Sequence, residues 1–451
     1  MHFYLIYIDP IFVLLSNQRI MKKWPYFSCL LLLPLGFARP CSMFKITLYG
    51  KTMVGNNEDA WRIDSRIWFE KGEHGNYGAA YVGHEDWFPQ GGLNEAGLAY
   101  DGFKVYGRAL HIRKGLKKMG SFPDFLKSIL RECATVRDVQ RMADRYDRRA
   151  LNGSMLLYVD RSGEYLVVEA DTTILGHDEK YVLSNFCPSV TPNLDAVPIS
   201  RYQRGRAFLR DKADTSLRFC TAVMDTMHEC RPGLGDGTAY TSIYDLNQGL
   251  IYLYFYHDFR RHVTFDLKKE LAKGNHMFIM HSLFPPNSEY IRLTRYKTPF
   301  NSHPLEVALV LMGGFMIITL PLFLIIYLVA LWRQAKTGIS RPYLFIWPLL
   351  LVINLAMTWY AYNLLSNHAM YYFPAPYKEE GRWFFNLSAW FPLTLLLLFV
   401  PITIGIIGYT RRLPSRPFAR KLLSAGLFGL NGLVYGVLLC LFGYWGFYAA
   451  L

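Results

Sequence analysis

The sequence predicts an α+β domain followed by an all-α membrane domain of four transmembrane helices. Three observations support this prediction. Strand-like and helix-like segments fill residues 41–290, charged residues become sparse beyond His303, and four apolar stretches follow, each near the roughly 20 residues that span hydrocarbon. A chain of 451 residues has room for both parts.

Residues 1–40 are expected to form a signal peptide or propeptide. The segment MKKWPYFSCLLLLPLGFA, Met21 to Ala38, has a basic start, an apolar centre and a small residue at its end, which is typical of a secretory signal peptide. Residues 1–20 fit an upstream extension better than part of a long signal, so Met21 is the expected start.

Residues 41–290 have the composition of a globular domain. Segments rich in β-branched and aromatic residues predict strands: KITLYGKTMVG, SMLLYVD, YLVVEAD and LIYLYFYHDF. Two segments predict helices, RYQRGRAFLRDKAD and FPDFLKSILRECATVRDVQRMADRY, and the second has Phe122, Phe125, Leu126, Ile129 and Leu130 at helical spacing. Because strands precede and follow the helices, a layered α+β domain is favoured over alternating βαβ units.

A polar linker, residues 291–305, leads to the expected membrane domain, residues 306–451. Its four predicted spans are 306–332, 343–365, 387–409 and 422–449. Asn354 and Asn431 lie within spans, where buried asparagines are expected to hydrogen-bond between helices rather than mark a transport path.

The charge of the loops predicts the topology. The loops WRQAKTGISRPY and YTRRLPSRPFARK are basic and belong on the cytoplasmic side, whereas SNHAMYYFPAPYKEEGRWFFN is weakly charged and belongs outside. An odd number of crossings then places residues 41–290 on the periplasmic or extracellular side, in agreement with the signal peptide. We expect an integral protein of a bacterial inner membrane.

Composition also argues against some functions. The net charge of +14 comes without a basic block interleaved with aromatic residues, so nucleic-acid binding is not expected. The seven cysteines include no CxxC and no His/Cys group at zinc spacing, so neither a metal nor a cofactor is expected. Cys220 and Cys230 could form a disulfide or remain two buried thiols.

Cys41 stands just after the expected signal peptide, in ARPCSMF. A cysteine at a chain start has its own α-amino group, with a pKa of about 7.7–8.0, as a base for a thiol with a pKa of about 8.5. A cut after Ala38 leaves Arg39 and Pro40 in front, so a second cleavage is required.

Four further motifs follow Cys41: VGNNEDAW around Asp59, LNEAGLAYDGF around Asn94, VLSNF around Asn185, and ISRYQRGRAF around Arg201. In this order and spacing, the five motifs resemble those of the choloylglycine hydrolase and penicillin V acylase family of N-terminal nucleophile hydrolases.

The resemblance implies an αββα sandwich that hydrolyses a non-peptide C–N amide through a cysteine acyl-enzyme. It implies that Cys41 is the nucleophile, that Asp59 orients its freed amine, that Asn94 and Asn185 donate to the oxyanion, and that Arg201 favours the thiolate. Asn56 stands where many members have an arginine, which puts the bile-salt and penicillin substrates in doubt. Arg204 and Arg206 compete with Arg201 for its role.

The leading functional hypothesis is a membrane-tethered amidase. Four helices exceed what anchoring requires, which suggests an amphiphilic N-acyl substrate that arrives from the membrane lipid. A non-catalytic sensor of small amides and an acyltransferase using the same acyl-enzyme are the alternatives. Assembly into a homo-oligomer is also compatible with the resemblance.

Overall fold

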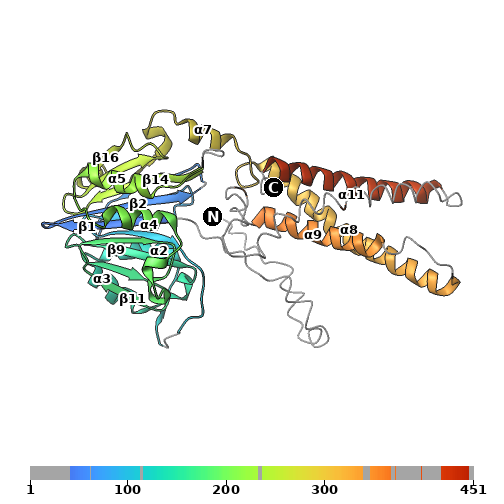
Figure 1. Cartoon of the computed structure of the whole chain (residues 1–451), viewed down its shortest axis with the longest axis horizontal. Coiled ribbons are helices and arrows are strands. Elements are labelled where there is room, and N and C mark those ends of the chain that lie inside the picture. The colour runs from blue at the N-terminus through green and yellow to red at the C-terminus, as the bar shows by residue number, and fades with distance from the viewer. Residues whose placement is uncertain are drawn as a thin grey trace. The chain divides into compact units, whose positions relative to one another are not determined.

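The computed structural model describes residues 41–60, 62–111, 115–231, 236–338, 346–366, 371, 398 and 418–445. The expected signal peptide, residues 1–40, lies outside the described residues, as does the third expected span, 387–409, apart from residue 398. Figure 1 shows the described strands and helices of the predicted globular domain, followed by three long helices.

The first sheet has seven strands and is antiparallel throughout. Its main path runs β12 (Lys180–Ser184), β1 (Cys41–Leu48), β2 (Lys51–Ala60), β14 (Asp236–Asp245), β15 (Leu250–Phe255) and β16 (Val263–Asp266), and β13 (Cys230–Arg231) pairs with β14. Tyr49 and Gly50 form the turn between β1 and β2 with φ of 51° and 77°, which matches the twist of a two-residue hairpin.

The second sheet has eight antiparallel strands. Its order is β11 (Thr173–Gly176), β10 (Tyr165–Val168), β9 (Ser154–Val159), β6 (Ala99–Lys104), β5 (Pro89–Asn94), β4 (Ala79–Gly83), β3 (Arg66–Glu70) and β17 (His276–Ile279). A small parallel pair joins β7 (Lys117–Lys118) and β8 (Tyr146–Asp147). The four segments predicted to be strands from composition all contain strands, so these predictions are confirmed.

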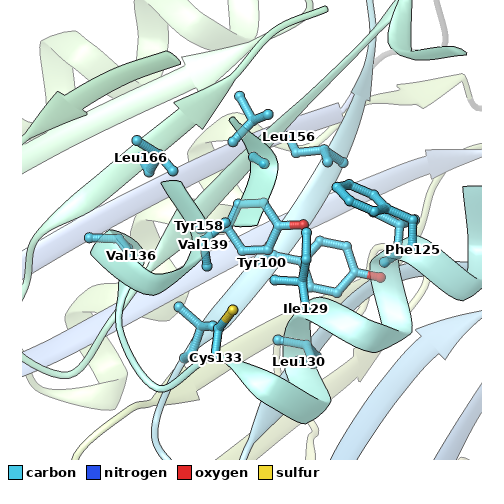
Figure 2. Close-up of a cluster of buried hydrophobic side chains, with 14 of the residues drawn as sticks. Tyr100, Phe125, Ile129, Leu130, Cys133, Val136, Val139, Leu156, Tyr158 and Leu166 are labelled. Atoms are coloured by element: carbon cyan, nitrogen blue, oxygen red, sulfur yellow. The ribbon is translucent and has the colours of Figure 1, made fainter. Parts of the chain in front are cut away.

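One apolar core lies between the second sheet and the helices α2 (Phe122–Glu132) and α3 (Val136–Ala143). Figure 2 shows Tyr100 and Tyr158 of this core, whose stacked rings have centroids 5.3 Å apart, together with Leu130 and Val139 from the helices. The predicted apolar spacing of α2 is confirmed, because Phe125, Leu126, Ile129 and Leu130 are all buried.

The segment predicted as one helix from Phe122 onward forms two. The first helix ends at its C-cap Cys133, whose backbone is extended, and Thr135 begins the second with a capping box to Asp138. The first N–H groups of a helix have no acceptor within that helix. The capping box provides acceptors for two of them, so the local sequence favours the start of a new helix here.

A second core lies between the first sheet and the helices α4 (Ser200–Leu209) and α5 (Leu217–Met227). The prediction of a helix in RYQRGRAFLRDKAD is confirmed by α4. Strand β1 contacts β6 of the other sheet, so the two sheets lie between the two helical pairs. The domain is therefore α+β in four layers, and the helices come as two separate pairs rather than one central group.

Short elements complete the domain. These are the 3-10 helices η2 (Arg148–Leu151), η3 (Pro188–Val190), η4 (Leu194–Ala196) and η5 (Met280–Leu283), and the helices α6 (Leu267–Ala272) and α7 (Ser288–Arg295). Helix α7 continues across the expected domain end at residue 290, and its Tyr290 hydroxyl donates to the Ile63 carbonyl at 2.9 Å. The helix therefore packs on the globular domain.

Three long helices follow: α8 (His303–Thr337), α9 (Ile346–Ser366) and α11 (Phe418–Tyr444). Two of the described helices, α8 and the part of α9 from Pro348 to Ser366, are long and apolar enough to cross a membrane, and a shorter apolar stretch covers Gly429–Tyr444. Large apolar side chains such as Leu311, Ile318 and Leu433 are more than 60% exposed, which is unusual for a surface in water.

Polar contacts connect these helices. The Asn354 side-chain amide of α9 donates to the Thr319 hydroxyl of α8 at 3.1 Å, and that hydroxyl lies 3.5 Å from Oδ1 of Asn431 in α11. All three side chains are buried. The expectation that both asparagines hydrogen-bond between helices is thus confirmed for Asn354, and Asn431 reaches the same hydroxyl at the limit of a hydrogen bond.

Candidate active site

Cys41 begins β1 and lies directly opposite Glu58 of β2 in the antiparallel register. Directly opposed residues in such a pair have their side chains on the same face of the sheet. The Cys41 thiol therefore lies 3.2 Å from Oε2 of Glu58, and both side chains are buried. This contact is fixed by the short β1–β2 hairpin.

The backbone of Cys41 is held by residues at the end of β12. The Cys41 N–H donates to Oδ1 of Asn185 at 2.7 Å, and the Ser184 hydroxyl donates to the Cys41 carbonyl at 2.8 Å. The Asn185 amide donates in turn to the carbonyl of Lys104 at 2.8 Å. Asn185 thus holds the nitrogen that would become the α-amine after cleavage before Cys41.

Asp59 lies on the opposite face of β2 from Glu58, toward α4. The Arg201 Nε, from the first turn of α4, is 3.8 Å from Oδ2 of Asp59 and 3.5 Å from the Cys41 carbonyl, and Arg201 also donates to Asn185. A β-bulge lets Thr238 lie opposite Asp59 while Tyr240 lies opposite Glu58, and the Thr238 hydroxyl donates to Asp59.

The three arginines considered for the role beside Cys41 differ in their side-chain contacts. Arg201 is buried and is the arginine that reaches Cys41 and Asp59. Arg204 donates to the Thr226 carbonyl, and Arg206 pairs with Asp195 at the surface.

The surroundings of the Cys41 thiol favour its protonated form. Burial raises the pKa of Cys41 well above its usual range, and the nearby carboxyls of Glu58, Asp101 and Asp59 add to the increase. Burial also raises the pKa of Asp59, although Arg201 and Thr238 oppose this shift. These surroundings oppose the thiolate that the resemblance implies.

Two further buried polar side chains interact with Glu58. Asp101 of β6 is fully buried, and its pKa is raised by burial and by Glu58. The His84 Nε2 is 4.0 Å from Oε1 of Glu58, with His84 also fully buried. Both sheets therefore contribute acidic or titratable groups to the space between them.

A cavity of about 380 Å³ opens beside Cys41 and Glu58. Its apolar lining comes from Phe88, Phe103, Phe122, Leu126, Met155 and Leu156. Charged side chains of both signs also line it, because Arg62 and Lys104 lie there with the carboxylates of Glu58 and Asp86, and Arg62 is ion-paired with Asp86 at 2.6 Å. Such a cavity can take an apolar chain together with a polar end.

Asn94 does not join this group. Its side-chain amide donates to the carbonyls of Leu130 and Cys133 at 2.7 and 2.8 Å, and its Oδ1 accepts the Leu98 N–H at 2.9 Å. Both amide hydrogens thus bind the end of α2, and Asn94 is not among the residues that line the Cys41 cavity. In this arrangement Asn94 caps a helix and closes the β5–β6 turn.

We expect Asn94→Ala to change stability rather than the chemical step. The substitution leaves two buried carbonyls without their donor, which typically costs about 1–3 kcal/mol. An oxyanion donor would instead lose about 10²–10³ in kcat. Melting temperature and kcat measured on the same preparation separate the two roles: a lower melting temperature with kcat retained fits the cap, whereas a kcat loss at unchanged stability would restore the oxyanion role.

The structure thus brings together Cys41, Asp59, Asn185 and Arg201 and places Asn94 elsewhere. Glu58, Asp101, His84 and Lys104 were not among the residues singled out for catalysis. The signal for Glu58 was present in the sequence, because the two ends of a short hairpin must face each other. The other three depend on how the second sheet packs.

No known protein-family profile matches the chain, and no curated protein does. Solved structures similar to it include a variant of conjugated bile acid hydrolase from Clostridium perfringens, at 17% identity and a TM-score of 0.43 over 55% of this chain and 97% of that one. A second variant of that hydrolase has 17% identity and a TM-score of 0.42, over 56% and 97%. Penicillin V acylase from Agrobacterium tumefaciens has 14% identity and a TM-score of 0.39, over 51% and 87%. At these TM-scores the likeness supports no conclusion about activity.

Proposed function

We propose that the chain is an amidase that hydrolyses a linear C–N amide through Cys41 as an N-terminal nucleophile. The observation that carries this proposal is the set of contacts around Cys41: Asn185 binds its nitrogen, Glu58 binds its thiol, and a cavity opens beside both. Any buried N–H needs an acceptor, but a structural cysteine needs no carboxylate at its thiol and no open cavity beside it. The motif resemblance of the sequence is a second, independent support.

The proposed reaction uses the α-amine of mature Cys41 as base. The amine takes the thiol proton as sulfur attacks the substrate carbonyl carbon, and it then gives the proton to the leaving nitrogen as the C–N bond breaks. A water molecule, deprotonated by the same amine, attacks the thioester and releases the acid. Asn185 and Asp59 orient the amine, and Arg201 holds both of these residues in place.

Maturation requires cleavage of the bond between Pro40 and Cys41. We propose that Cys41 performs this step itself. Glu58 accepts the thiol proton, sulfur attacks the Pro40 carbonyl carbon, and the acyl group moves from nitrogen to sulfur as the peptide nitrogen is protonated. Water then hydrolyses the thioester and leaves a free α-amine.

Glu58→Gln provides a test with two opposite expectations. If Glu58 is the proton acceptor, the variant matures more slowly, by about 10²–10⁴-fold, the usual effect of removing a general base. If Glu58 acts only through its charge, its removal lowers the pKa of the Cys41 thiol and maturation accelerates. The fraction of chains that begin at Cys41, followed by intact mass during expression, distinguishes the two.

The proposed substrate is an amphiphilic N-acyl compound. The apolar lining of the cavity fits an acyl chain, and the charged groups of both signs at its rim, Lys104 and the Arg62–Asp86 pair, fit a polar head group. Two candidate membrane-spanning helices in the same chain are consistent with supply of such a compound from a bilayer. We propose membrane tethering by four helices, with the catalytic domain outside the cytoplasm.

The direct experiment combines two measurements on full-length protein extracted in detergent. The first is the N-terminal residue, determined by intact mass and peptide sequencing. The second is release of amine from a panel of N-acyl amino acids and N-acyl amines of increasing chain length. Amine release by chains that begin at Cys41 supports the proposal. Protein that retains Pro40, or that cleaves no amide in the panel, would favour the alternative function, a non-catalytic sensor of small amides.

A further inference from the structure

A second cluster of reactive side chains lies apart from Cys41, where α7 packs against the first sheet. It consists of Cys230 at the start of β13, His257 just after β15, and Glu289 in the first turn of α7. One ligand-type atom from each residue lies within 4.8 Å of the other two. These residues are far apart in sequence, which is why no metal-binding spacing is visible there.

The contacts within the cluster are centred on the Glu289 carboxylate. The His257 Nδ1 is 2.6 Å from Oε2 of Glu289, and the Cys230 sulfur is 3.7 Å from Oε1. With zinc bonds of about 2.0–2.3 Å in a tetrahedron, neighbouring ligand atoms are about 3.3–3.6 Å apart. The observed distances need only small side-chain movements to reach this geometry.

The donor set identifies the kind of ion. Sulfur and imidazole ligands favour zinc or a similar transition metal over magnesium or calcium, which prefer oxygen. A cysteine thiolate and a glutamate carboxylate carry two negative charges, which neutralise a divalent ion.

The surroundings fit a bound ion with one further ligand. A cavity of about 550 Å³ is lined by His257 and Glu289 and opens the site on one side. Tyr256, with a left-handed φ of 55°, turns the chain between β15 and His257.

We propose that Cys230, His257 and Glu289 bind one Zn²⁺ ion and leave its fourth position open to the cavity. On binding, the thiol releases its proton to solvent, the Nδ1 proton moves to Nε2, and Nδ1 and the carboxylate turn to the metal. The ion then joins β13, the end of β15 and α7. It fastens the last helix of the domain, independently of whether Cys41 is a nucleophile.

The test uses full-length protein in detergent, stripped of metal with a chelator and desalted. Co²⁺ is titrated in while the thiolate-to-cobalt charge-transfer absorption is followed, and Zn²⁺ is then added as competitor. We expect one Co²⁺ per chain, displacement by Zn²⁺, and a higher melting temperature with either ion. Absence of saturable binding to the wild-type chain overturns the proposal.

Variants assign the ligands. Cys230→Ser should lose the charge-transfer band and weaken Co²⁺ binding by more than the roughly 10–100-fold typical of an outer-shell partner. Cys187→Ser, which removes a partly buried thiol elsewhere in the domain, should retain both. The reverse pattern, with the band lost only in Cys187→Ser, overturns the assignment.

The Cys230→Ser variant needs a folding control, because a misfolded chain would also fail to bind Co²⁺. Circular dichroism of the metal-free Cys230→Ser variant should match that of the metal-free wild-type chain. If this variant does not fold, Glu289→Gln decides, because it keeps the thiol and the side-chain volume. A band that remains with weaker affinity supports the site, and unchanged affinity overturns it.

Discussion

Replacing Cys41 by alanine is expected to abolish amide hydrolysis, with a fall in kcat/KM of at least about 10⁴-fold. The substitution removes the sulfur that contacts Glu58, and with it the atom that forms the acyl-enzyme in the proposed reaction. In the proposed maturation the same sulfur attacks the Pro40 carbonyl, so the variant should also keep its N-terminal extension. Amine release and intact mass measure the two effects.

The matched control is Cys187→Ser, which removes a partly buried thiol elsewhere in the domain and should leave hydrolysis unchanged. Because Cys41 is small and lies at the start of its strand, alanine should disturb packing little. Cys41→Ala protein that still hydrolyses the amide would exclude Cys41 as nucleophile. Cys41→Ala protein that binds the amide without hydrolysing it is the expected result, because only the acyl-enzyme needs the sulfur.

Arg201→Met is expected to have the second largest effect, because it removes both stability and activity. Asp59 is fully buried and Arg201 is the cation that faces it, so the variant leaves a buried carboxylate without its partner. Breaking a buried ion pair in this way typically costs about 3–5 kcal/mol. The Asn185 oxygen also loses a donor, and the backbone of Cys41 loses a contact.

The stability loss in Arg201→Met should depend on pH. Burial raises the pKa of Asp59 in the folded state, and removing Arg201 raises it further. A carboxyl with a raised folded-state pKa binds more protons when the chain is folded, so its contribution to protein stability is highest in acid and declines as pH rises through the folded-state pKa. Above the folded-state pKa of Asp59 in the wild type only the variant continues to lose stability, so the difference in melting temperature between the two should grow as pH rises.

Arg206→Met is the matched control for this prediction. Arg206 lies on the same helix and pairs with Asp195 at the surface, where an ion pair is worth about 0–1 kcal/mol. The control should melt close to the wild type at every pH. Equal melting temperatures for Arg201→Met and Arg206→Met would show that Arg201 does not support the site.

Much of the secondary structure could be predicted because it depends on the type and spacing of neighbouring residues. The spacing of Phe125, Leu126, Ile129 and Leu130 predicted α2, and enrichment in β-branched and aromatic residues predicted strands in the segments that form the β1–β2 hairpin, β9 and β10. The break between α2 and α3 was missed, although the capping box at Thr135 was visible in the sequence. Apolar length alone predicted the helices α8 and α9.

The sequence by itself determined that Cys41 follows an apolar leader-like segment, that the domain is α+β, and that long apolar helices come after it. Only the tertiary structure decided that Asn185 and Arg201, 144 and 160 residues from Cys41, contact it, and that Asn94 caps a helix instead. The same holds for Glu289 meeting Cys230 and His257. The physical reason is that hydrophobic periodicity encodes which face of each element is buried, whereas partners across the domain depend on strand register and on how the layers pack.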